Sequence, residues 1–97
     1  MGCAASTEPV VTFDSSQPYR LDAMVAVRPE PFGALAYHYG SRRLTFLRTK
    51  LLADVVTDLD GFESVDSALD ARVPVAEHRS YRRALAQLAS SEFIRAC

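Results

Sequence analysis

The sequence lacks an excess of charge of either sign, and it contains no long run of apolar residues. Eleven basic side chains are matched by twelve acidic ones, whereas a dedicated nucleic-acid-binding domain is usually strongly basic, so nucleic acid is disfavoured as a partner. The longest apolar stretches fall far below the ~20 residues of a membrane-spanning helix, and the N-terminus has no charged start followed by an apolar run. We therefore expect a cytoplasmic protein with no membrane partner.

Residues that build metal or catalytic sites are also scarce. The two cysteines, Cys3 and Cys97, stand at opposite ends of the chain and outside any Cys-x-x-Cys or Cys/His spacing, so neither a metal nor another cofactor is predicted. His38 and His78 have no serine or cysteine motif near them, so no catalytic triad is predicted either. The sequence indicates a protein that is not an enzyme.

The remaining composition is that of one small globular domain. With 97 residues and a hydrophobic content of 48%, the chain supports one core and is too short for two. Residues 1–18 are small and polar and contain Pro9 and Pro18, which predicts a flexible N-terminal arm. The domain itself is predicted over residues 19–97.

Alternation of period two predicts an antiparallel three-stranded sheet in the first half of this domain. The strands are expected at 24–28, 32–39 and 43–48. Leu35, Tyr37 and Tyr39 fall on one face of the second strand, and its even-numbered residues fall on the other. Between the second and third strands, Gly40-Ser41 is the pair that a two-residue type II′ turn prefers, with the glycine supplying a positive φ.

From Thr49 the period changes to 3.6, which predicts three helices. Thr49 and Ser64 are the expected N-caps of the first two helices, and Gly61 is the expected stop between them. The apolar stripes are Leu52, Val55, Val56 and Leu59 in the first helix, Val65, Ala68 and Leu69 in the second (65–71), and Tyr81, Leu85 and Leu88 in the third (76–91). Three strands followed by three helices, the middle one short, predict an α+β fold of winged-helix-like arrangement.

Two segments of this chain resemble a known family. The first runs from Val25 through Arg28-Pro29-Glu30-Pro31-Phe32-Gly33 to Leu47, and the second reads Ser-Tyr-Arg-Arg-Ala-Leu-Ala-Gln-Leu-Ala over 80–89. With the residues around them, about 19–94, they resemble the mycofactocin peptide chaperones, which are similar to the pyrroloquinoline-quinone peptide chaperone. The resemblance implies binding of the leader of a ribosomally made precursor peptide as an added β-strand. It also implies presentation of that peptide to a radical S-adenosylmethionine maturase in mycofactocin biosynthesis.

The residues themselves offer a physical site for such a peptide. A sheet that ends at strand 43–48 leaves one row of backbone N–H and C=O groups unpaired, and an extended peptide can add there. We expect the third helix to form the other wall, where two alanines permit close approach and an arginine meets carboxylates. The expected peptide-binding residues are Leu44, Thr45, Phe46, Leu47, Arg48, Arg82, Leu85, Ala86 and Ala89.

Some details of this site stay open at the level of sequence. Phe46 and Leu47 must face opposite sides of the strand, and Leu47 is favoured as the one that contacts peptide. Proline at Thr45 or Leu47 is expected to abolish binding by removing an edge donor. The helical stripe that contains Leu85 is favoured as core, although its neighbours line the expected groove.

Three other interpretations remain beside the chaperone. A DNA-binding winged helix would place Arg79, Arg82 and Arg83 in the major groove, but the balanced charge speaks against it. A small regulatory subunit would contact its enzyme and ignore the peptide. Finally, an open edge strand makes a homodimer through that strand an alternative assembly.

Overall fold

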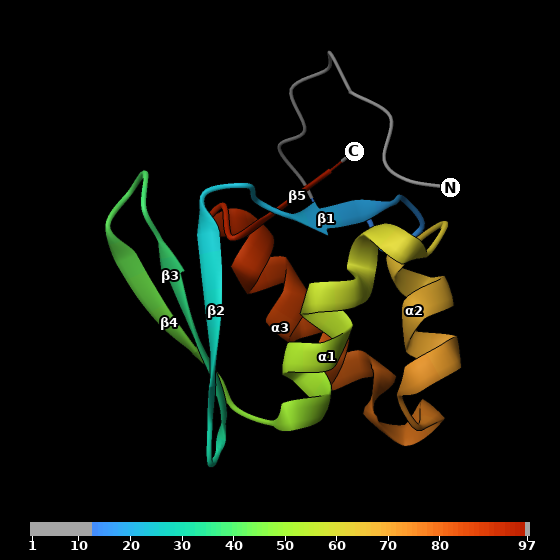
Figure 1. Cartoon of the computed structure of the whole chain (residues 1–97). Helices are drawn as coiled ribbons and strands as arrows, with labels where there is room; N and C mark the ends of the chain where they lie inside the picture. The colour runs from blue at the N-terminus through green and yellow to red at the C-terminus, as the bar shows by residue number, and fades with distance from the viewer. Residues whose placement is uncertain (1–12, 97) are drawn as a thin grey trace.

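The structure is a computed structural model that describes residues 13–96. The first twelve residues of the arm predicted over 1–18, with Cys3 among them, lie outside the described residues, as does Cys97. The elements, in chain order, are β1 (Tyr19–Leu21), β2 (Val25–Glu30), β3 (Gly33–His38), β4 (Arg43–Leu47), α1 (Lys50–Asp58), α2 (Val65–Arg72), α3 (His78–Ser90) and β5 (Ile94–Ala96). Short 3₁₀ turns at Leu59–Gly61 and Val75–Glu77 follow α1 and α2. Figure 1 shows the sheet on one side of the helices.

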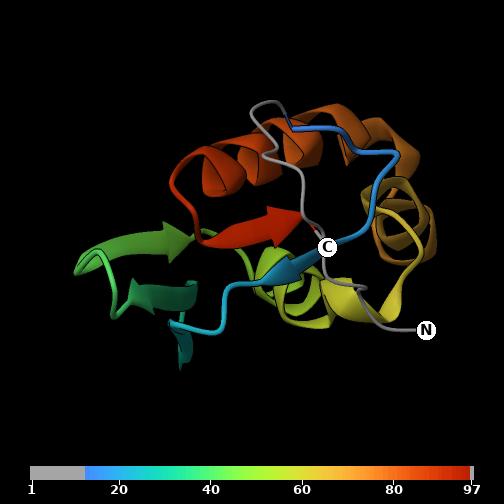
Figure 2. The same ribbon diagram turned by 90° about the horizontal axis from the view of Figure 1, so that it is seen from above.

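The predicted three-stranded antiparallel sheet is present, in the order β2-β3-β4. At its centre Ala36 pairs with Val27 on one side and with Thr45 on the other. Figure 2 shows β4 on the side of the sheet nearest α3, and β2 on the side nearest α1. The α+β class with three helices is therefore confirmed.

A second, two-stranded ribbon joins the two ends of the described chain, and the sequence did not predict it. β1 pairs antiparallel with β5, with Arg20 opposite Arg95. Each strand has only three residues, which is too short for alternation to be recognised. Ile94 and the preceding Phe93 are almost completely buried, so this ribbon closes over the core.

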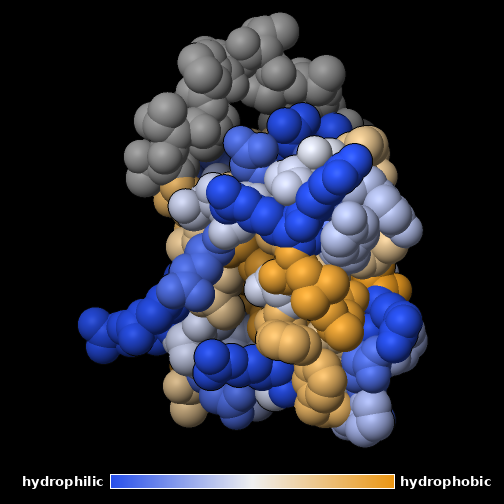
Figure 3. All heavy atoms as spheres, turned by 90° about the vertical axis from the view of Figure 1, so that its left-hand side faces the viewer, coloured by the Kyte–Doolittle hydropathy of each residue, from blue (hydrophilic) through white to orange (hydrophobic). Residues whose placement is uncertain are grey.

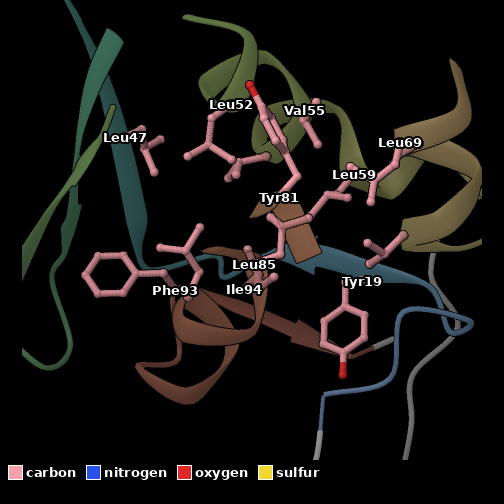
Figure 4. Close-up of a cluster of buried hydrophobic side chains, with 14 of the residues drawn as sticks. Tyr19, Leu47, Leu52, Val55, Leu59, Leu69, Tyr81, Leu85, Phe93 and Ile94 are labelled. Atoms are coloured by element: carbon pink, nitrogen blue, oxygen red, sulfur yellow. The ribbon is translucent and has the colours of Figure 1, made fainter. Parts of the chain in front are cut away.

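The helices follow the predicted caps and stripes closely. The Thr49 side chain accepts a hydrogen bond from the Leu52 amide, and the Ser64 side chain accepts one from Ser67. All predicted stripe residues are buried, and Leu85 has 0% exposure. Figure 4 shows Leu85 and Ile94 in the middle of the cluster, between Phe93 and Leu47 on one side and Leu59 and Leu69 on the other. Among residues 13–96, no helix is both long and apolar enough to cross a bilayer.

The turn between β3 and β4 differs from the prediction. It has four residues, 39–42, because His38 pairs with Arg43, and the Arg42 amide donates to the His38 carbonyl over 2.7 Å. Arg42 adopts the positive φ, 61°, and no glycine of the described chain does. The buried His38 ring explains the longer loop, since its Nδ1 lies 3.1 Å from the Ser41 amide and accepts a hydrogen bond from it. The two-residue type II′ turn was therefore wrong.

Gly33 fixes the distance between the start of β3 and the end of β4. A Cβ atom there would overlap the Leu47 carbonyl oxygen and would lie 2.8 Å from the Thr49 nitrogen. Only glycine allows this approach, which sets where β4 turns into α1. Gly61 is different: it ends the 3₁₀ turn after α1 in open space, without a positive φ.

Residues 13–18 run along the start of α2. The Gln17 carbonyl accepts from the Val65 amide and the Ser15 carbonyl accepts from the Asp66 amide, so they satisfy helix N–H groups that lack intrahelical partners. Asp14 accepts from the Ser16 hydroxyl at 2.6 Å and from its amide at 3.0 Å, and these hydrogen bonds hold the pKa of that carboxyl below its ordinary value.

Candidate functional site

A groove of about 790 Å³ lies between β4 and α3. Its floor is apolar, because Leu47, Leu52 and Leu88 are all more than 90% buried and line it from below. Its walls carry polar side chains on both sides, together with one aromatic ring on each side and one alanine on the helix. The wall residues are Thr45, Phe46, Arg48 and Thr49 on the strand side and Glu77, Ser80, Tyr81, Ala84, Gln87, Ser90 and Ser91 on the helix side.

One cross-link sets the width of the groove at one end. The Thr49 hydroxyl lies 3.2 Å from the hydroxyl of Tyr81, which connects the end of β4 to the first turns of α3. The same threonine caps α1, so a single residue ties the strand, α1 and α3 together. The groove therefore has walls that are positioned before any ligand arrives, which lowers the entropic cost of binding.

The backbone of β4 presents free hydrogen-bonding groups along this groove. In an antiparallel ladder, residues alternate between those that bond the neighbouring strand and those that point away from it. The Tyr39 amide donates to the Met24 carbonyl, which fixes the alternation across the sheet: Thr45 and Leu47 bond to β3, and Leu44 and Phe46 point outward. Within residues 13–96, no other segment bonds to the backbone of Leu44 or Phe46.

The opposite edge of the sheet, β2, offers fewer free backbone donors than β4. By the same alternation, Val25, Val27 and Pro29 point outward from β2. Pro29 has no N–H group, and the Val25 amide already donates to the Asp22 carbonyl over 3.0 Å. A space of about 670 Å³ lies between this edge and α1, but the Val27 amide is the only outward backbone donor that β2 offers there. Of the two edges, β4 is thus the one suited to receiving a strand.

Comparison with known proteins identifies the family of this chain. Residues 18–95 match the peptide chaperone MftB family. This chain belongs to that family. It is 47% identical over 83 residues to the peptide chaperone MftB of Mycobacterium ulcerans, covering 84% of this chain and 76% of that protein. It is 42% identical over 85 residues to the peptide chaperone MftB of Mycolicibacterium smegmatis, covering 87% and 83%. No solved structure matches the chain.

This MftB-family chain places the strand half of the predicted site together and the helix half apart. Thr45, Phe46, Leu47 and Arg48 all line the groove, and Leu44 contributes the outward backbone groups. None of the four predicted helix residues lines it: Arg82, Leu85, Ala86 and Ala89. Any role of those four in peptide binding stays a prediction that this groove does not support.

The helix residues are displaced because α3 offers two flanks beside one buried stripe. At about 100° per residue, Ser80, Ala84 and Gln87 lie on one flank, and Ala86 and Ala89 lie on the other. Both flanks adjoin Tyr81, Leu85 and Leu88, so periodicity cannot tell which one faces β4. Ala84 is the alanine that lines the groove, and its small side chain leaves room above the floor.

Arg82 and Leu85 are engaged inside the fold. Arg82 Nε lies 3.0 Å from Asp66 Oδ1, so this arginine bridges α3 to α2 on the side away from the groove. Leu85 is fully buried in the core. Periodicity had indicated core for Leu85, and the structure agrees.

Phe46 and Leu47 face opposite sides of β4, as alternation requires. Leu47 is 1% exposed and forms part of the groove floor, where it also belongs to the core. Phe46 is 59% exposed, so the core member of the pair is Leu47, the residue that the sequence had favoured as the peptide contact. The outward donors belong to Leu44 and Phe46, and proline at Thr45 or Leu47 would instead remove a bond to β3.

The two histidines have structural partners. His78 Nε2 lies 2.7 Å from the Val73 carbonyl, and His38 Nε2 lies 3.8 Å from Asp22 Oδ1. Asp22 also lies 2.8 Å from Arg95 Nε, which ties the hairpin to the β1–β5 ribbon. Over the described part of the chain, no group of three or more potential ligand side chains could hold a metal ion.

Proposed function

We propose that this chain binds the leader of a ribosomally made precursor peptide as a fourth strand on β4 and presents it to a radical S-adenosylmethionine maturase in mycofactocin biosynthesis. The observation that carries the proposal is the row of outward backbone groups on Leu44 and Phe46 beside an apolar groove. Strand addition needs this combination, because the main chain supplies affinity and pockets under alternate side chains supply selectivity. It requires no catalytic group.

Apolar anchors dominate the energetics of such a complex. A Leu- or Val-sized side chain that is fully buried on the groove floor contributes roughly 1.5–3 kcal/mol. An exposed ion pair contributes only ~0–1 kcal/mol, so Arg48 at the groove rim tunes selectivity and does not hold the peptide alone. The expected leader is therefore an extended segment with alternate apolar residues toward Leu47 and Leu88.

The charge around β4 indicates the character of the occupant. Arg42, Arg43 and Arg48 bracket the strand, and all three are exposed. An acidic segment is attracted to this edge, whereas two copies of β4 paired through the same edge would bring six arginines together. The homodimer through β4 is accordingly disfavoured relative to peptide addition.

A matched pair of alanine substitutions tests the groove. Ala84 and Ala86 are both half-buried on α3, but only Ala84 lines the groove. Ala84→Phe places a ring over the floor and is expected to weaken binding of a synthetic leader at least tenfold in a calorimetric titration. Ala86→Phe, on the other flank, is expected to leave the affinity within twofold. The titration is run with and without the purified maturase.

The opposite pattern would reject the site. If Ala86→Phe lowered the affinity for the leader and Ala84→Phe did not, the peptide would lie on the flank of Ala86. If neither folded variant changed the affinity, the peptide would not bind along α3. Binding of any DNA duplex that collapses with added salt would favour the DNA-binding alternative, for which Arg82 is already occupied by Asp66.

A further inference from the structure

The large apolar side chains that remain exposed are concentrated on the sheet. Six such side chains are exposed among residues 13–96, and five of them lie on or beside β2–β4: Met24, Phe32, Tyr39, Leu44 and Phe46. The sixth, Val75, lies in the turn before α3. Figure 3, which views the molecule from the side of the sheet, shows an apolar patch bordered by hydrophilic side chains. A concentrated apolar patch is a mark of an interaction surface.

Alternation in β3 puts its larger side chains on the face away from the core, whereas the inward residues of the neighbouring strands, Val25, Val27 and Leu47, pack against it. On the face toward the helices, β3 buries only Ala34, Ala36 and His38. On the opposite face, Leu35 pairs with Phe46 and Tyr37 with Leu44. We call the set Phe32, Leu35, Tyr37, Tyr39, Leu44 and Phe46 the outer face. If the sheet served only to cover the helices, the larger residues would be expected on the inside, so the outer face has another use.

The aromatic rings of the outer face are arranged in pairs. Phe32 and Phe46 meet edge to face with centroids 5.6 Å apart, and Tyr37 and Tyr39 do so at 4.9 Å. These contacts hold the rings in place on the surface, and little ordering entropy remains to be lost on binding. Tyrosine, phenylalanine and arginine are the residue types enriched at protein–protein interfaces.

Charge selects between the candidate occupants. Arg28 and Glu30 of β2 lie on the side of the outer face as an ion pair, and two further exposed basic side chains, Arg42 and Arg48, lie at the two ends of β4, so the charge along this face is basic. A second copy of the same face would bring two basic surfaces together, which is unfavourable. A protein surface with an apolar centre and an acidic rim complements this face in both respects.

We propose that the outer face docks the enzyme that modifies the bound peptide, through an apolar enzyme surface with an acidic rim. This inference rests on the proposed function. A leader added to β4 extends the same sheet, so alternate side chains of the leader lie next to Leu44 and Phe46 on the outer face. An enzyme on this face contacts chaperone and peptide at once, and binds the loaded chaperone more tightly than the empty one.

Two single substitutions on opposite turns of the sheet test the surface. Phe32→Glu and Tyr39→Glu replace side chains that are 46% and 60% exposed, so neither needs to disturb the core. Each variant is expected to bind the purified maturase at least tenfold more weakly than the wild-type protein does, in the presence of saturating leader. Affinity for the leader alone is expected to stay within twofold in Tyr39→Glu, because the Tyr39 ring pairs with Tyr37 and not with the groove residue Phe46. Val75→Glu makes the same change at an 82% exposed apolar residue away from the sheet and is expected to leave both affinities unchanged.

Each other outcome points to a different conclusion. Unchanged maturase affinity in both variants overturns the proposal and leaves peptide binding intact. If the wild-type protein sediments as a dimer and Phe32→Glu converts it to a monomer, the outer face binds a second copy and the proposal is overturned. The proposal is also overturned if the wild-type protein binds phosphatidylglycerol vesicles and both variants lose that binding. If wild-type protein fails to bind leader, the proposed function falls, and maturase affinity alone then decides the outer face.

Discussion

Removal of one backbone donor from β4 separates strand addition from every other way of using the groove. Phe46→Pro deletes an N–H group that points away from β3, so the ladder within the sheet keeps its hydrogen bonds. Proline is tolerated at such edge positions. The peptide, however, loses the partner for one of its carbonyl groups, and the ring blocks the close approach that a second bond requires.

The expected size of the effect follows from the geometry. Leu44 and Phe46 together offer two donors and two acceptors. One lost bond and one weakened bond, at about 1 kcal/mol each, give a loss of ~2 kcal/mol or roughly 30-fold in Kd. Phe46→Ala keeps the donor and removes the ring, so comparison of the two variants isolates the hydrogen bond.

The assay is calorimetric titration of a synthetic leader into each folded variant, with circular dichroism as the check on fold. Val27→Pro removes the outward donor of the opposite edge and is expected to leave the affinity unchanged. If Phe46→Pro and Phe46→Ala bound the leader equally well, the β4 backbone would not pair with the peptide. A loss in Val27→Pro alone would move the site to β2.

Two further comparisons follow from the positions of paired residues. Arg48→Glu is expected to weaken the binding of an acidic leader several-fold in a titration at low salt. Arg82→Glu breaks the ion pair with Asp66 on the other flank of α3, so it is expected to lower the thermal midpoint of unfolding and to leave the leader affinity unchanged. The reverse result would show that the leader lies against the flank of Arg82. Gly33→Ala is expected to destabilise the fold by about 1–3 kcal/mol in denaturant unfolding, because the added methyl group overlaps backbone atoms. Gly61→Ala, in open space, is expected to raise the free energy of unfolding by ~0.5 kcal/mol. Equal effects of the two substitutions would refute the close approach at Gly33.

Local patterns in the sequence predicted the elements that depend on local physics. The alternation of residues 32–48 defined the β3–β4 hairpin, and Thr49 and Ser64 marked two helix starts through their side-chain caps. These features survive because a cap or an alternating face has the same chemistry in any fold. The family resemblance, confirmed over residues 18–95, was carried by the same segments.

Features that depend on the arrangement of elements in space were not available from patterns. The four-residue turn at 39–42 depends on a hydrogen bond to the buried His38 ring. The β1–β5 ribbon joins residues more than seventy positions apart, in strands too short to show a period. The flank of α3 that faces β4 is set by how the helix packs, so the helix side of the site was predicted at Arg82 and Ala86, whereas the groove beside β4 is lined by Ala84.

Amide hydrogen exchange measured by NMR, with and without a saturating leader peptide, tests strand addition most directly. Thr45 and Leu47 amides bond to β3 and are expected to exchange slowly in both states, whereas Leu44 and Phe46 amides are expected to become protected only when the leader is bound. The Val27 amide on the other edge is expected not to change. Rapid exchange of the Leu44 and Phe46 amides in the saturated complex would contradict the account.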